Sequence, residues 1–159
     1  MTNLPPTKLI KDVLDGLLGR EVAVFPADAL APADAIGGAL ALYIDDSRAL
    51  GAVAGWDLPA AAHVGSAVAL VPARGARAAI ADQYLPENLL ENLNEVSNVL
   101  ATVFHIPGNR HLRLERTYRP INTAPADAIQ LLYALGHRID LVIDIPAYGA
   151  GRLAVSMRF

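Results

Sequence analysis

The chain has 159 residues, of which 53% are hydrophobic, and it contains no cysteine. This length and hydrophobicity predict one folded domain over residues 1–159 and exclude a disordered chain. Without cysteine, a disulfide framework, a thiolate metal site and a cysteine nucleophile are excluded. The formal net charge of −3 disfavours a nucleic-acid-binding protein. We see no secretory signal and no apolar run of membrane-spanning length, so we expect a cytoplasmic protein without membrane partners.

The first half of the chain is predicted to contain a helix, a short strand, a loop and two hairpin strands. Apolar residues spaced three and four apart predict a helix at 7–18, which Gly19 ends. A strand is expected at 21–25, followed by a loop rich in Pro and Ala. Residues 38–45 alternate as a strand, with Leu40, Leu42 and Ile44 on one face and Ala39, Ala41 and Tyr43 on the other. The return strand is predicted at 50–56.

Two further helices, at 58–72 and 73–83, are predicted to connect the halves. The second half is predicted to contain a helix, a strand, a short helix and two strands, at residues 86–105, 110–119, 125–134, 138–145 and 152–159. We interpret strand 152–159 as an edge strand that can pair with a second copy, which makes a homodimer plausible.

The order of elements nearly repeats along the chain. The hexapeptide Ala-Pro-Ala-Asp-Ala-Ile occurs at 31–36 and again at 124–129, both times between the first strand of a half and its hairpin strands. We therefore predict two related helix-plus-three-strand halves, at about 5–72 and 86–159. The predicted fold class is α/β (α+β), with one mainly antiparallel sheet and helices packed against it.

The helix predicted at 86–105 carries the residues of greatest chemical interest. Its buried stripe is predicted from the spacing of five apolar residues, namely Leu89, Leu93, Val96, Leu100 and Val103. On the other side, Glu91, Glu95, Asn98 and Thr102 follow the same spacing. Because residues three and four apart are neighbours on a helix, Glu95 and Asn98 present a carboxylate and an amide side by side.

Two interpretations of this polar face are open. An amphipathic helix needs a polar side, and Glu and Asn are ordinary members of one. Asn is nevertheless an unfavourable residue in the middle of a helix, since its amide competes for backbone hydrogen bonds. This helix contains Asn92, Asn94 and Asn98, which favours a functional interpretation.

The segment from Glu91 to Ala101 resembles the Glu-x-x-Asn helix of the CheC/CheX phosphatase family of bacterial chemotaxis. In that family an acidic residue or Ser precedes the Glu by four positions, as Glu91 does here. A Pro lies some two dozen residues after the Asn, and Pro120 fills that position. The family is built from two related helix-plus-three-strand halves, as predicted here. Thr102 departs from the Gly that the family often has at this place.

The first predicted helix has Asp12-Val13-Leu14-Asp15 where a second Glu-x-x-Asn motif would stand. The resemblance therefore implies one site, as in the CheX type, and not two, as in the CheC type.

The resemblance implies hydrolysis of the aspartyl phosphate on a CheY-like response regulator. Glu95 and Asn98 would be the catalytic residues, with Asn98 orienting the attacking water and Glu95 pairing with a Lys of the regulator. Glu91, Asn94 and Thr102 would contact the partner. The protein would need no cofactor of its own, because the Mg²⁺ belongs to the regulator.

The sequence is also compatible with other functions. The same fold could serve as a non-catalytic docking or assembly domain, as in flagellar switch components, or as a sensory domain. The four histidines show no metal-ligand spacing, so we predict no metal site. Four arginines lie on the predicted strand, namely Arg110, Arg113, Arg116 and Arg119. Because they point alternately to opposite faces, we favour a solvated face over a site for an anionic partner.

Overall fold

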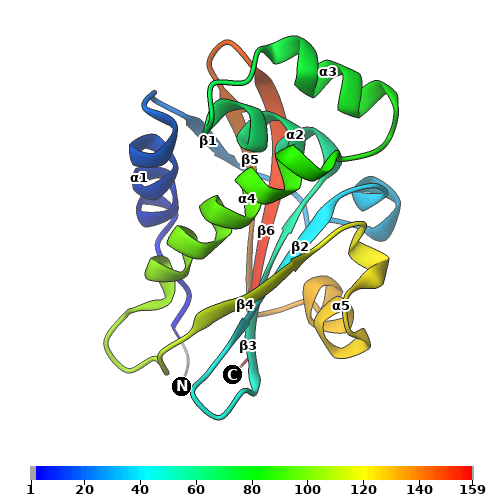
Figure 1. Cartoon of the computed structure of the whole chain (residues 1–159). Coiled ribbons are helices and arrows are strands. Elements are labelled where there is room, and N and C mark those ends of the chain that lie inside the picture. Colours follow the sequence, from blue (N-terminus) through cyan, green and yellow to red (C-terminus); the bar gives the residue numbers. More distant parts are fainter. Residues whose placement is uncertain (1–2, 159) are drawn as a thin grey trace.

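The structure, a computed structural model, describes residues 3–158, and within them it contains five α-helices and one six-stranded sheet (Figure 1). The helices are α1 (Thr7–Leu18), α2 (Leu58–Ala67), α3 (Ala73–Ala81), α4 (Glu87–Leu100) and α5 (Ala126–Tyr133). The strands are β1 (Ala23–Pro26), β2 (Ala39–Ile44), β3 (Leu50–Trp56), β4 (Arg113–Tyr118), β5 (Arg138–Ile145) and β6 (Gly149–Met157). Short 3-10 helices are η1 (Pro32–Ala35), η2 (Ala101–Phe104) and η3 (Ile121–Thr123).

The sheet has the strand order β1-β5-β6-β3-β2-β4, and every neighbouring pair is antiparallel. The order is symmetric about its centre. The first strand of each half, β1 or β4, pairs with the second strand of the other half, β5 or β2. The halves therefore exchange edge strands and build one sheet together, which confirms the predicted α+β class.

The prediction that the last strand lies at an edge is wrong. β6 pairs with β5 on one side and with β3 on the other, so it offers no free edge to a second copy. The edges are β1 and β4. The alternation of apolar residues along a strand shows which residues share a face of the sheet, but it does not show which strands lie beside it, because strand pairing joins segments far apart in the sequence. Residue 159, the predicted end of this strand, lies outside the described residues.

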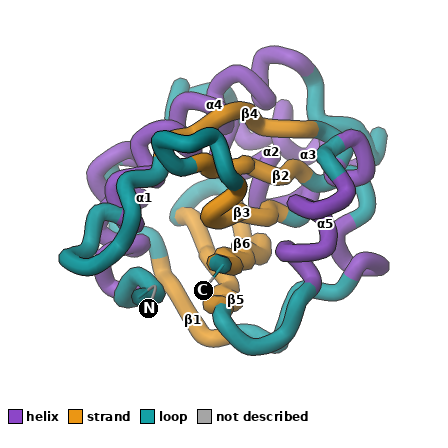
Figure 2. Tube along the Cα trace, turned by 90° about the horizontal axis from the view of Figure 1, so that it is seen from below, coloured by secondary structure: helices purple, strands orange, loops and turns teal. Residues whose placement is uncertain are grey.

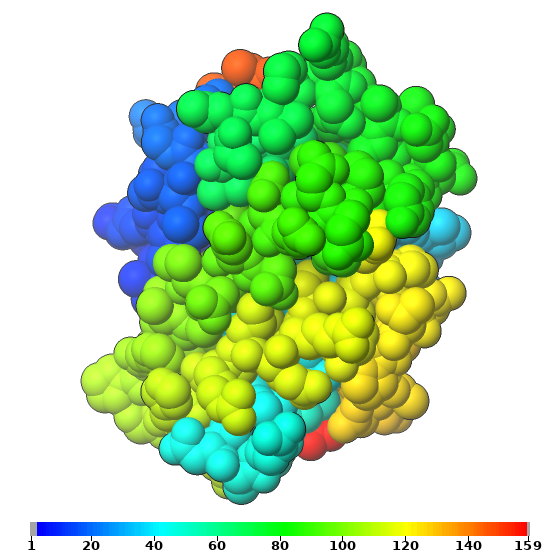
Figure 3. Space-filling view, viewed as in Figure 1, coloured from blue at the N-terminus to red at the C-terminus, as the bar shows by residue number. Residues whose placement is uncertain are grey.

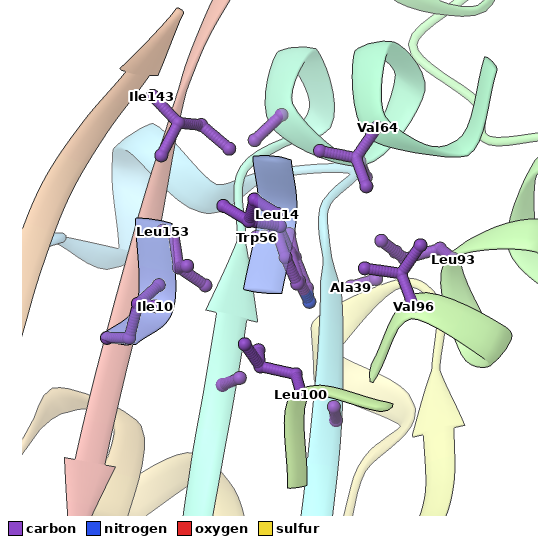
Figure 4. Close-up of a cluster of buried hydrophobic side chains, with 14 of the residues drawn as sticks. Ile10, Leu14, Ala39, Trp56, Val64, Leu93, Val96, Leu100, Ile143 and Leu153 are labelled. Atoms are coloured by element: carbon purple, nitrogen blue, oxygen red, sulfur yellow. The ribbon is translucent and has the colours of Figure 1, made fainter. Parts of the chain in front are cut away.

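Helices cover both faces of the sheet. α1, α2 and α4 lie on one face, and α5 lies on the other (Figure 2). The predicted alternation of β2 is confirmed, since Ala39, Ala41 and Tyr43 belong to the first core and Leu40, Leu42 and Ile44 to the second. In the first core, side chains of α1, α2 and α4 meet those of β3, β5 and β6 around the fully buried Trp56 (Figure 4).

Helix α4 is fixed against α2 and the sheet by close contacts. A Cβ atom at Gly65 of α2 would lie 2.7 Å from the carbonyl oxygen of Leu89, so only glycine permits this approach of the two backbones. Asn92 Nδ2 donates to the carbonyl oxygen of Gly65 at 2.8 Å. Further along, the Tyr43 hydroxyl donates to the carbonyl oxygen of Ser97 at 2.6 Å. These contacts set which side of α4 faces solvent.

Several predicted bounds differ from the observed ones. The helix predicted at 86–105 ends at Leu100 and continues as the 3-10 helix η2. The helix predicted at 58–72 ends at Ala67, and the strand predicted from residue 110 begins at Arg113. Helix ends depend on tertiary contacts that local periodicity does not contain. No helix among residues 3–158 has both the length and the apolar character needed to cross a bilayer.

Candidate functional site: the exposed ridge of helix α4

The five predicted site residues lie on one exposed side of α4 and η2. They are Glu91, Asn94, Glu95, Asn98 and Thr102, and we call them the polar ridge; all five are exposed. At 3.6 residues per turn they occupy one narrow sector of the helix. The opposite side is anchored by Leu89, Leu93, Val96 and Leu100, each at most 1% exposed. The predicted buried stripe is thus confirmed, and it aims the ridge at solvent.

The polar groups at the centre of the ridge have no internal partners. Within residues 3–158, the side chains of Glu91, Asn94, Glu95 and Asn98 form no hydrogen bond and no ion pair. Thr102 differs, because its Oγ1 donates to the carbonyl oxygen of Val99 at 2.9 Å. Four side chains, two carboxylates and two amides, are therefore available to another molecule.

Asn92 has a different role from the other two asparagines singled out in this helix. Its amide binds the carbonyl oxygen of Gly65 and so ties α4 to α2. The position of Asn92 in the sequence does not reveal this role, since Gly65 is 27 residues away. Only Asn94 and Asn98 retain the feature that favoured a functional interpretation, a costly helix residue without a structural reason.

A groove runs between α4 and the edge strand β4. Glu87, Leu90, Glu91, Asn94 and Glu95 line it from the helix, and Arg116 and Thr117 line it from the strand. Its volume is about 450 Å³. The surfaces of α4 (green) and β4 (yellow) lie next to each other on the face shown in Figure 3. Asn98 and Thr102 do not line the groove. Three residues of the polar ridge therefore lie in the groove, and the other two lie on the open surface of the helix.

The charges of this region are unevenly distributed. α4 contains three glutamates and no Lys, Arg or His. Glu87 is neutralised by Arg119, whose Nη2 lies 2.7 Å from Glu87 Oε2. Arg119 also donates to the carbonyl oxygen of Leu85 and lies over the Tyr84 ring. Glu91 and Glu95 have no such counter-ion within the described residues, so the ridge carries two unpaired negative charges.

Pro120 does not join this site. It follows β4 and lines a separate hollow together with Ile36, Ile129 and Tyr133. Both copies of the hexapeptide contribute to that hollow, through residues 32, 35 and 36 and through residue 129. The resemblance gave Pro120 a place in the motif, and the structure puts it outside the α4–β4 groove.

The four arginines singled out in the sequence are not equivalent. Arg110 Nη1 lies 3.0 Å from Asp45 Oδ2, and Arg119 binds Glu87. The guanidinium of Arg116 lies 5.2 Å from the Tyr118 ring centre. The interpretation of these side chains as solvated agrees with the exposure of Arg110, Arg113 and Arg116, but it misses two ion pairs and the partial burial of Arg119, whose side chain is 15% exposed. Among residues 3–158, no group of three or more His, Asp or Glu side chains is arranged to hold a metal ion.

Solved structures of other proteins share this architecture. FliM in the FliM–SpeE complex from H. pylori superposes with a TM-score of 0.63 at 8% identity, over 94% of this chain and 80% of that one. The CheX–CheY–BeF3–Mg²⁺ complex from Borrelia burgdorferi gives 0.56 at 15% identity, over 94% and 93%. Thermotoga maritima FliY gives 0.57 at 10% identity, over 93% and 81%. The chain has the CheC/CheX/FliM fold. Neither family models nor curated protein sequences match it.

Within the CheC/CheX/FliM fold, the two halves of this chain differ in their helices. α1 takes the place in the first half that α4 takes in the second. On α1, Lys8 binds Asp12 at 2.8 Å and Lys11 binds Asp15 at 2.6 Å. The polar side of α1 is thus paired internally, whereas the ridge of α4 is not. Among the described residues, the charged side chains of α1 at the motif positions are therefore engaged in ion pairs, whereas Glu95 and Asn98 of α4 are not.

Proposed function

We propose that the protein binds a CheY-like response regulator of chemotaxis or two-component signalling and accelerates hydrolysis of its aspartyl phosphate. The observation that carries this proposal is the pair Glu95 and Asn98, an unpartnered carboxylate and an unpartnered amide three residues apart on an exposed, firmly anchored helix. Support comes from the fold, which is shared with a complex that contains CheX and CheY.

For hydrolysis of the aspartyl phosphate, the main task of the protein is to position the reacting groups. Water attacks the phosphorus in line, the bond from phosphorus to the aspartyl oxygen breaks, and inorganic phosphate and the free carboxylate result. Holding the water in line supplies most of the rate enhancement. The amide of Asn98 suits this task, because its oxygen accepts a hydrogen bond from the water and its NH₂ donates hydrogen bonds, without any change of charge. Mg²⁺ and the phosphorylated aspartate belong to the regulator.

Glu95 has a positioning role in this proposal. Its carboxylate lies one helical turn before Asn98 and has no counter-ion in the described residues. It pairs with a Lys ammonium of the regulator and so places α4 over the phosphoryl group. Glu91, Asn94 and Thr102 contribute flanking contacts on the same side of the helix.

A second candidate function is docking without catalysis. Its supporting observation is the similarity to FliM and FliY, whose TM-scores of 0.54 to 0.63 lie on both sides of the 0.56 of the CheX complex. One of the FliM structures is a complex with FliG. In this case the polar ridge would bind a partner, and Asn98 would be one contact among several.

The decay of a phosphorylated regulator distinguishes the two functions. CheY-like regulators from the same genome are phosphorylated, and the loss of phosphate is followed with and without the protein, beside Asn98→Ala. We expect the native protein to accelerate decay and Asn98→Ala to bind the regulator without accelerating it. Binding without acceleration by the native protein would refute the phosphatase and favour docking.

A further inference from the structure

The α4–β4 groove has features that the catalytic pair does not use. Glu91 and Asn94 line it, are exposed, and have no partner among residues 3–158. Glu87 lines the same groove but is neutralised by Arg119. Besides Glu95, which belongs to the catalytic pair, the groove thus offers a second uncompensated carboxylate, at Glu91, next to the Asn94 amide, whose oxygen is free to accept a hydrogen bond.

Thr117 supplies an independent observation on the opposite side of this groove. The residue is 6% exposed, and its hydroxyl is buried without a hydrogen-bond partner in the described part of the chain. A buried hydroxyl without a partner costs free energy, and proteins generally satisfy such groups. The same groove also contains the free acceptor groups of Glu91, Asn94 and Glu95, so an unsatisfied hydroxyl beside them points to a hydrogen-bond donor from outside.

The chemistry of the groove identifies that donor as a cation. Carboxylate, amide and hydroxyl oxygens all accept hydrogen bonds, and a Lys ammonium carries three donors and no acceptor. Arg116, the cation that lines the groove, lies over the Tyr118 ring and forms no ion pair with Glu91 or Glu95. α4 contains no basic residue and Arg116 is not paired with these carboxylates, so a basic side chain of a partner would complement the groove.

We propose that the α4–β4 groove binds a basic side chain of the partner protein, with Glu91 as its counter-ion and with Asn94 and Thr117 as further acceptors. The identification of that partner as a response regulator rests on the proposed function. This basic side chain is separate from the Lys that pairs with Glu95. Glu91 is then a specificity residue, because a partner without a matching cation leaves its charge unpaired.

The first experiment uses a probe that does not depend on the regulator. The peptide acetyl-Gly-Lys-Gly-amide is titrated into the isotopically labelled protein, with the norleucine peptide as a neutral control, and amide NMR shifts are followed. We expect millimolar binding of the Lys peptide alone, with shifts confined to 87–95 and 116–117. Glu91→Gln should weaken it at least threefold, whereas Asp127→Asn, which removes one charge on α5 across the sheet, should not.

Thr117→Val tests the hydroxyl separately. The hydroxyl has no internal partner, so its loss should leave the stability unchanged or raised. If it receives the cation, Thr117→Val should also weaken the Lys peptide. Unchanged binding in both Glu91→Gln and Thr117→Val, or shifts spread over all acidic surfaces, would overturn the proposal.

The second experiment links the groove to the regulator and separates the two proposals. Affinity for the regulator and its decay rate at saturating protein are measured for Glu91→Gln and Asn98→Ala. We expect Glu91→Gln to weaken binding three- to tenfold and to reduce its salt dependence, with an unchanged rate at saturation. If Asn98→Ala abolishes acceleration while Glu91→Gln binds as the native protein does, the groove proposal fails and the phosphatase stands. If no regulator is bound but the Lys peptide maps to the groove, the proposed function fails instead.

Discussion

Helices α1 and α4 occupy equivalent places in the two halves of the sheet, but they differ in how their polar sides are satisfied. On α1, each of two lysines binds an aspartate one turn later, and Asp15 also accepts from the backbone N–H of Val22 at 2.7 Å. On α4, the polar ridge carries two carboxylates and two amides without internal partners. Both helices bury an apolar stripe against the same face of the sheet.

The comparison of α1 and α4 shows which features of these helices the fold requires and which it does not. Burial of one side suffices to hold a helix on a sheet, and α1 completes its other side with i, i+4 pairs of opposite charge, which are mildly stabilising. α4 lacks such pairs and contains asparagines that weaken a helix. The polar side of α4 thus lacks the stabilising pairs that the related helix has, which is the difference that the proposed function accounts for.

The largest expected effect tests whether the buried sides of the two helices are equivalent. Leu93 of α4 and Leu14 of α1 are both fully buried. We expect Leu93→Ala and Leu14→Ala each to lower the free energy of unfolding by about 2–5 kcal/mol, because each leaves a cavity in the same core. Urea denaturation measures both. A much smaller loss for Leu93→Ala would show that α4 is loosely held and that the geometry of its ridge is not fixed.

The next largest effect is expected when the polar side of α4 is compared with that of α1. Given the proposed function, Asn98→Ala should slow regulator dephosphorylation roughly a hundredfold, comparable to the loss of one preorganised hydrogen-bonding group in other enzymes. Its free energy of unfolding should change by no more than about 0.5 kcal/mol, since the side chain is exposed and unpartnered. Asp12→Ala on α1, at the position that corresponds to Glu95, is a control on the related helix and should leave the rate unchanged. Equal losses in both variants would mean that the two helices do not differ in function.

The sequence predicts the faces of these helices because the apolar spacing of an α-helix is local. Leu89, Leu93, Val96 and Leu100 are buried as expected, and the ridge is exposed. Val99, an apolar residue next to this stripe, is 40% exposed. It lies at the margin of the stripe, where the position of the neighbouring elements decides burial and the helical period does not.

Long-range contacts are the part that the sequence does not reveal. The bond of Asn92 to Gly65, the central place of β6 and the buried hydroxyl of Thr117 all depend on segments that are distant along the chain. The Glu-x-x-Asn spacing identifies candidate residues, but whether they are free or internally paired depends on their surroundings. Asp15 shows the opposite outcome, since its side chain binds Lys11 and Val22.

Asp15 provides a pH-dependent test of the internally paired helix. Burial raises its pKa, but the hydrogen bonds from Lys11 and Val22 outweigh burial and hold the pKa below the ordinary value of 3.8. Because the folded-state pKa is lowered, this stabilisation is complete above pH 3.8 and is lost as the pH falls through the folded-state value. We expect Asp15→Asn to cost about 1–2 kcal/mol at pH 7.

The difference in unfolding free energy between the native protein and Asp15→Asn should shrink as the pH is lowered from 5 towards 2.5. Urea denaturation at several pH values measures it. Asn98→Ala, measured alongside, should show no such convergence, because Asn98 does not titrate. A difference that stays constant with pH would show that the pairing on α1 does not depend on the charge of Asp15.

The smallest changes in the free energy of unfolding are expected for two asparagines within α4 itself. Asn92→Ala removes the hydrogen bond to Gly65 and leaves that carbonyl oxygen unpaired between α2 and α4, so we expect a loss of about 1 kcal/mol in the free energy of unfolding. Asn94→Ala removes an exposed amide without partners and introduces a better helix former, so we expect a gain of up to about 0.5 kcal/mol. Thermal and urea denaturation of the two variants, side by side, give the sign of each change. Opposite signs would show that Asn92 belongs to the fold and that Asn94 is kept at a cost to stability, as a residue for partner contact should be. A loss of equal size in both would place Asn94 among the structural residues and narrow the ridge to Glu91, Glu95 and Asn98.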